Sequence, residues 1–216
     1  MSQTTLRSIA GISIPDSTIA TQATELLLTH GTEFLYNHSL RVFLFASLNA
    51  QRDDIRYDRE LLYISAVFHD LGLTPHYSSP DKRFEVDGAN AAREFLKGHG
   101  ISKEQIQLVW DTIALHTTIG IAEYKEPEVA LLYSGVGLDV MGEGYERLSD
   151  THREEIITAF PRTDFKKRII PTFFSGFEHK TDTTFGNIKA DVCAFMIPEF
   201  KRKNFCECIL HSPWQE

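Results

Sequence analysis

The stretch AVFHDLGL, residues 66–73, places a histidine and an aspartate side by side at the end of an apolar run. Taken alone, the pair has an ordinary structural interpretation, in which His69 is a hydrogen-bonded core residue and Asp70 is a cap. The same two side chains can bind a metal ion, because imidazole nitrogens and carboxylate oxygens are common ligands of divalent cations. The positions of the other polar residues in the chain distinguish the two interpretations.

Helical periodicity surrounds this stretch on both sides, and the alternation typical of strands is almost absent. Caps such as Ser17, Asp58 and Ser102, Pro127 as a first helical residue, and glycine stops divide the chain into helices. The expected helices cover 18–30, 33–51, 57–70, 84–100, 103–117, 127–142, 151–160, 163–174, 186–197 and 198–210. The helix over 163–174 is expected to bend or end near Pro171. The sequence therefore predicts an all-α fold.

Length and composition predict a single domain. The chain has 216 residues, of which 42% are hydrophobic and 24% charged, as in an ordinary globular domain. A core of this size needs no disulfide or structural metal, so a metal ion would serve chemistry. We expect one domain over 1–216, with a motif-bearing core at about 30–145 and a helical extension at about 146–216.

Charge and apolar patterning exclude several classes of partner. The chain carries 22 basic and 30 acidic residues, a formal net charge of −8, and its basic runs are short, such as KRK at 201–203. A nucleic-acid partner is therefore not expected, because duplex binding requires a basic surface. No apolar run approaches the roughly 20 residues that a membrane span requires, and the first residues do not resemble a signal peptide. The three cysteines fit reduced thiols, so we expect a cytoplasmic protein that acts on a small molecule, with self-association left open.

Polar residues occur on the apolar faces of four different helices. His38 lies three residues after Leu35 and four before Val42, and His116 follows Ile113 at helical spacing. Asp139 lies in an apolar helix, where an unpaired carboxylate would be costly. A single metal ion would satisfy several of these inward groups at once. Zinc is the expected ion, with iron, manganese or nickel as alternatives, since histidine and carboxylate ligands do not choose among them.

Three segments together resemble a known family. They are YNHSLR at 36–41, AVFHDLG at 66–72 and GLDV at 137–140. Their order resembles the His…His-Asp…Asp signature of the HD-domain metal-dependent hydrolases. The resemblance covers roughly residues 30–145 and implies a helical bundle that binds one divalent metal ion. The ligands that it implies are His38, His69, Asp70 and Asp139.

Finer features are similar to the cyanamide-hydratase-like group of that family. The segments FLYNHSLRVF at 34–43, HDLGLT at 69–74 and RFEVDGANAA at 83–92 carry this likeness. Many phosphohydrolase members have a lysine just after the glycine of His-Asp-x-Gly, whereas this chain has Leu73. The difference weakens an interpretation as a phosphohydrolase.

Several residues outside the signature are candidates for catalysis or substrate binding. Asp70 is the candidate proton acceptor, and His116 and Glu85 are candidate acid/base groups. Glu85 also has a structural interpretation, because a carboxylate at a helix N-terminus is favourable. Arg41, Lys82 and Arg83 are the side chains that could meet an anionic substrate.

The leading functional hypothesis is a hydrolase or hydratase in which a metal-activated water attacks a small molecule, such as a nitrile or cyanamide. The runner-up is hydrolysis of a nucleotide or other phosphomonoester, which predicts that the basic residues approach the metal. A binuclear iron oxygenase is a third hypothesis, and it requires a second well-placed histidine from His76, His99 and His116. A non-catalytic binding module is the fourth, although all four expected ligands are present.

Overall fold

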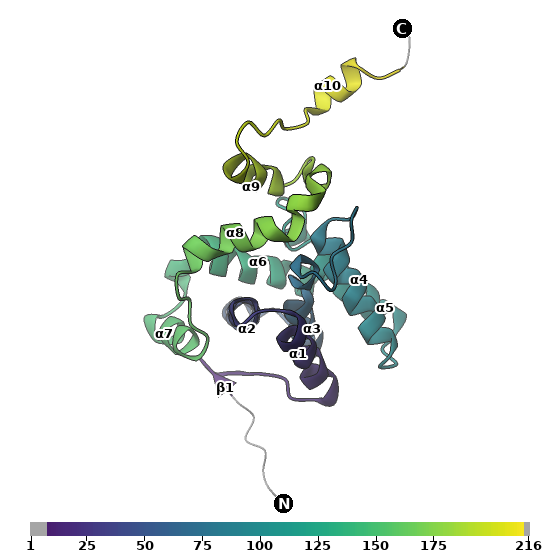
Figure 1. Cartoon of the computed structure of the whole chain (residues 1–216). Coiled ribbons are helices and arrows are strands. Elements are labelled where there is room, and N and C mark those ends of the chain that lie inside the picture. The colour runs from purple at the N-terminus through teal and green to yellow at the C-terminus, as the bar shows by residue number, and fades with distance from the viewer. Residues whose placement is uncertain (1–7, 214–216) are drawn as a thin grey trace, which may run out of the picture.

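The computed structural model describes residues 8–213 and is built almost entirely of helices (Figure 1). The α-helices are α1 Thr18–His30, α2 Glu33–Arg52, α3 Arg59–Phe68, α4 Phe84–Lys97, α5 Lys103–Ala114, α6 Pro127–Met141, α7 Asp150–Ala159, α8 Phe165–Phe177, α9 Lys189–Met196 and α10 Phe205–Leu210. Short 3-10 turns lie at η1 Leu71–Leu73, η2 Ala122–Tyr124, η3 Tyr145–Arg147 and η4 Glu178–Thr184. The all-α prediction is confirmed.

The predicted caps begin and end these helices for local reasons. The Ser17 hydroxyl accepts a hydrogen bond from the Ala20 amide, and the Asp58 carboxylate accepts from two amides of the first turn of α3. Pro127 is the first residue of α6, and Gly142 ends that helix with a left-handed backbone at φ 80°. The boundaries of α1 to α6 therefore follow from the sequence to within a few residues.

Three local features differ from the expectation. Residues Ser8–Ile9 (β1) and Ile12–Ser13 (β2) form a two-stranded antiparallel hairpin, whose turn uses Ala10 and Gly11 at φ 52° and 75°. Helix α8 continues through Pro171 to Phe177 instead of ending there. The last expected helix is reduced to α10, because residues 198–204 are not helical.

The core is organised around α2, which is buried over most of its length and lies at the centre of the helices in Figure 1. Its most extensive packing is against α6. Gly135 permits this approach, because a Cβ atom there would lie 2.5 Å from the Val42 carbonyl oxygen. The close packing of α2 and α6 brings His38 to Asp139.

A second close approach fixes the chain just after α3. A Cβ atom on Gly72 would overlap the Phe84 carbonyl oxygen at the start of α4, and one on Gly88 would lie 2.8 Å from the Phe68 carbonyl oxygen. The two glycines therefore let η1 and α4 pack backbone to backbone. This contact sets the position of His69 and Asp70 relative to α4.

The C-terminal helices join the rest through a small apolar cluster. Leu73 and Phe84 pack there with Phe177 of α8 and Cys193 of α9. Beyond α9 the chain extends away from the body of the molecule, and the residues of α10 are exposed (Figure 1). Among the helices within residues 8–213, none has both the length and the apolar character needed to cross a membrane.

Replacing Gly72 with alanine is expected to destabilise the protein by about 3 kcal/mol, because the added methyl group has no space and the backbone must shift. Denaturant unfolding measures the change in the free energy of unfolding. Gly98→Ala is the matched control, since Gly98 has a helical φ of −64° and an added Cβ would lie 3.3 Å from its nearest neighbour, the Phe95 carbonyl oxygen. Equal unfolding midpoints for the two variants would contradict the close approach.

Candidate metal centre

Four buried side chains from two helix ends and one helix interior converge at the centre of the bundle. His38 lies in the middle of α2, His69 is the C-terminal cap of α3, and Asp70 follows it. His116 lies two residues beyond the end of α5. The sequence predicts a helix over 103–117, which would have included this residue. All four side chains are at most 1% exposed.

The ligand atoms of His38, His69 and Asp70 lie within 4.8 Å of one another. The two histidine Nε2 atoms are 3.3 Å apart, and they lie 3.5 Å and 3.3 Å from Asp70 Oδ2. His116 Nε2 lies on the other side of the same carboxylate, 3.7 Å from Oδ1. Three imidazole nitrogens therefore surround one carboxylate.

Hydrogen bonds at the opposite ring nitrogens fix the tautomers of the three histidines. Nδ1 of His69 donates to the Ala66 carbonyl at 2.7 Å, and Nδ1 of His116 donates to the Ile113 carbonyl at 2.6 Å, because a carbonyl oxygen only accepts. Nδ1 of His38 donates to Asp139 at 2.7 Å. Each neutral ring therefore turns an unprotonated Nε2 toward the centre, as metal-ligating histidines do.

This arrangement leaves buried polar atoms without protein partners. Neither oxygen of Asp70 accepts a hydrogen bond from the described residues, and Nε2 of His116 makes none. Lone pairs that face one another at 3.3 Å repel unless a cation lies between or beside them. A divalent metal ion satisfies both requirements, so the donor set fits such an ion.

The pKa values of the four groups follow from burial and from one another. Burial, assisted by the nearby His69, lowers the pKa of His116 to about 4, so this ring is neutral at neutral pH. Burial also lowers the pKa of His38. Burial opposes charge on Asp70, but the surrounding histidines outweigh it and hold the pKa of that carboxyl well below its usual range. For His69, burial opposes the charged ring, but the adjacent Asp70 carboxylate outweighs it and raises the pKa of that imidazole. The site therefore holds an ionised carboxylate among three imidazoles, of which His38 and His116 favour the neutral form.

Asp139, which the sequence predicts as a direct ligand, is placed differently by the structure. Its carboxylate accepts from His38 Nδ1, from Arg41 at 2.8 Å and 2.9 Å, and from Arg162 at 3.1 Å. It does not belong to the group of ligand atoms around Asp70. Asp139 orients the His38 ring through its hydrogen bond to Nδ1, and both of its carboxylate oxygens also accept hydrogen bonds from arginines.

Two of the three predicted substrate-binding cations do not reach the centre. Arg41 is fully buried, with its guanidinium bound to Asp139 and to the carbonyl groups of residues 160 and 161, so most of its N–H groups are engaged within the protein. Lys82 is exposed and pairs with Asp81 at 3.2 Å. Only Arg83 approaches the centre, through its contact with Glu85.

Glu85 lies beside His116 but has no free oxygen. Lys189 of α9 donates to both carboxylate oxygens at 2.6 Å and 2.9 Å, and Arg83 and Thr117 donate to Oε1 at 2.8 Å and 2.5 Å. Burial alone would raise the pKa of Glu85, but Lys189 and Arg83 lower it to about 2. A carboxylate held in this way anchors its neighbours rather than exchanging protons near neutral pH.

Sequence reasoning missed Lys189 and Arg162. Lys189 is fully buried, and burial lowers its pKa to about 8. The sequence indicates the burial of Lys189 only weakly, through its position one helical turn before the buried Cys193. Arg162 follows the end of α7 in a loop, where no periodicity marks an inward side chain.

The other candidate histidines lie away from the centre. His76 stacks on His30, and His99 is exposed and bonds to the Phe95 carbonyl and to Gln22. No second group of three or more such ligands occurs among the residues that the structure describes.

Comparison with known proteins identifies a family for the chain. No curated protein matches the chain. The family model described as the HD domain matches residues 35–160, which contain every residue of the converging group. Proteins of this family are generally hydrolases that bind divalent metal ions, and the match covers more than half of the chain. The chain therefore belongs to the HD domain family.

Proposed function

We propose that the protein is a metal-dependent hydrolase or hydratase that uses one divalent ion, with zinc as the expected metal, to activate water for attack on a small molecule. The observation that carries the proposal is the Asp70 carboxylate, which is buried without a hydrogen-bond partner and faces the Nε2 atoms of three histidines. His38, His69 and Asp70 would hold the ion.

When bound, a divalent ion supplies Lewis acidity, which makes water a nucleophile near neutral pH and polarises a substrate atom. Asp139 and the Ala66 carbonyl keep the His38 and His69 rings in position for that ion. One oxygen of Asp70 can hold the proton that the attacking water loses. His116, neutral and 3.7 Å from Asp70, can pass a proton onward to the product.

The surroundings of the centre favour a small, weakly polar reacting group, such as a nitrile or cyanamide carbon. The Phe84 ring lies 5.6 Å from the His116 ring and forms an apolar wall beside it. A phosphomonoester is the alternative substrate, and it would need cations at its phosphate. Arg41 is buried and bound to Asp139, and Lys82 is exposed and paired with Asp81, so the alternative rests on Arg83.

Elemental analysis of the purified protein is expected to find one equivalent of a divalent metal per chain. His69→Ala and Asp70→Asn should each lose the metal and keep their helical circular dichroism, because the apolar core does not depend on the ion. His99→Ala, an exposed histidine elsewhere, is the control and should keep one equivalent. Two equivalents of iron in the unmodified protein would contradict the proposal and favour an oxygenase.

His116→Ala is expected to keep one metal ion and to lose most of the turnover found in a screen of nitriles and phosphate esters, by about 10²-fold or more. Chelator competition measures the metal affinity, and product formation measures the turnover. Loss of the metal from this variant would instead identify His116 as a ligand. Turnover of phosphate esters alone would favour the alternative function.

Lys189→Met is expected to destabilise the protein by about 3 kcal/mol, because it leaves the Glu85 carboxylate buried with fewer cations. The pKa of Glu85 should rise from about 2, since Lys189 is the largest favourable charge beside it. The double variant Lys189→Met with Glu85→Gln should recover part of the stability in denaturant unfolding. Independent, additive effects of the two changes would refute the pairing.

A further inference from the structure

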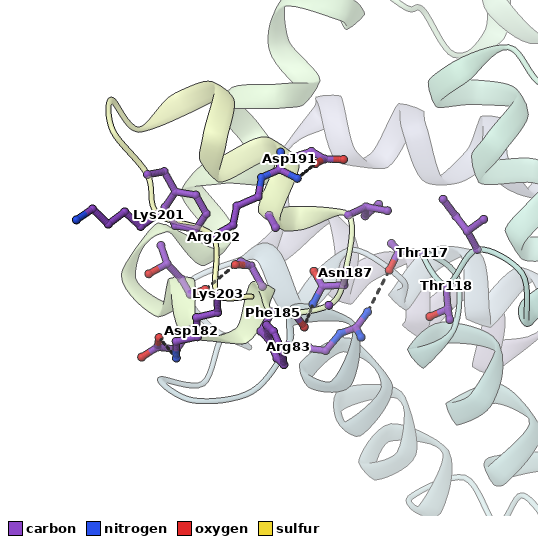
Figure 2. A pocket seen from close by; sticks show the side chains of 17 residues that line it. Arg83, Thr117, Thr118, Asp182, Phe185, Asn187, Asp191, Lys201, Arg202 and Lys203 are labelled. Carbon is purple, nitrogen blue, oxygen red and sulfur yellow. Dashed lines mark hydrogen bonds and ion pairs between the residues drawn. The ribbon is translucent and has the colours of Figure 1, made fainter. Parts of the chain in front are cut away.

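Figure 2 shows a cavity of about 580 Å³ between the start of α4 and the C-terminal segments. Its walls are formed by residues 117–119, 181–182, 184–188, 190–191 and 200–203, with Arg83 at one side. Arg83 and Thr117 both touch Glu85, and Thr117 directly follows His116 in the chain. The cavity therefore adjoins the centre, although none of the candidate metal ligands lines it.

The charges that line this cavity are predominantly positive, in a chain whose net charge is −8. Its two acidic residues are each neutralised, since Asp182 pairs with Lys203 and Asp191 pairs with Arg202, both at 2.7 Å. Lys201 has no acidic partner among residues 8–213. An excess positive charge therefore remains at the outer wall.

Arg83 forms the inner wall of the cavity, on the side of Glu85, and its guanidinium has N–H groups without a partner. Arg83 donates to Glu85 and Thr117 through Nη2 alone, and its buried Nε has no hydrogen-bond partner. The single negative charge of Glu85 is already bound by Lys189 at both oxygens. Arg83, Lys189 and Glu85 together thus carry one net positive charge, and the Arg83 side chain is 32% exposed.

The remaining lining suits an organic ligand rather than a bare ion. Phe185, Phe200 and Ile119 contribute apolar surface, and four threonines and Asn187 contribute hydroxyl and amide groups. The volume lies within the roughly 300–1,000 Å³ typical of small-molecule sites. A ligand that combines an apolar part with a carboxylate or phosphate group would match both the surface and the charge.

We propose that this cavity binds the anionic end of a small organic substrate, a carboxylate or phosphate group held by Arg83 at the inner wall. The inference rests on the proposed function, because it assigns the ligand to the same reaction. The anion lies apart from the reacting group, since no candidate metal ligand reaches the cavity. Its binding energy would serve to orient the substrate toward His116.

Three probes of similar size test the charge preference: phenylphosphonate, benzoate and the neutral benzamide. Titration followed by NMR or calorimetry should show both anions binding about tenfold more tightly than benzamide. The preference should weaken as salt is added. It should persist after metal removal by a chelator, because the cavity contains no metal ligand. Equal affinity for benzamide and benzoate would overturn the proposal.

Charge-removing variants locate the site. Arg83→Gln should weaken binding of phenylphosphonate and benzoate about threefold to fivefold. Lys82→Gln is the matched control, since Lys82 neighbours Arg83 in sequence but does not line the cavity. Unchanged affinity in Arg83→Gln would overturn the site. Metal content and turnover are measured on the same samples. If the protein binds the anions but contains no metal and shows no turnover, the anion site is supported and the proposed function is contradicted.

Discussion

The structure depends on one electrostatic constraint, which is the burial of the Asp70 carboxylate against the Nε2 atoms of three histidines. A buried negative charge without hydrogen bonds is costly, and lone pairs that face each other add to the cost. A cation at this point removes both penalties. The packing of α2 against α6, and of η1 against α4, serves to bring these groups within reach of one ion.

The residues around the centre divide into two layers with different tasks. Asp139 and two backbone carbonyls hold the outer nitrogens of the rings and so fix which nitrogen faces inward. Arg41 and Arg162 in turn hold Asp139, which explains why that carboxylate faces away from the ligand group. The result is a centre whose geometry is set by neighbours that do not themselves face the reacting atoms.

The C-terminal helices contribute chemistry as well as cover. Lys189 of α9 reaches Glu85 of α4 across 104 positions of sequence, and the same segment forms most of the adjoining cavity. Glu85 thereby links the start of α4, the turn that carries His116, and the C-terminal part of the chain. The family match ends at residue 160, so these contributions come from a part of the chain that the HD model does not cover.

The sequence by itself determined the all-α class, most helix ends and the inward placement of His38, His69, Asp70 and His116, because caps and apolar periodicity act within one or two turns. It did not reveal that the carboxylate of Asp139 binds the guanidinium groups of Arg41 and Arg162. Nor did it reveal that the Lys189 amino group binds the carboxylate of Glu85. Those outcomes were decided only by the tertiary structure. The reason is physical: each depends on charges brought together from distant segments, and a buried charge takes whichever partner the packing supplies.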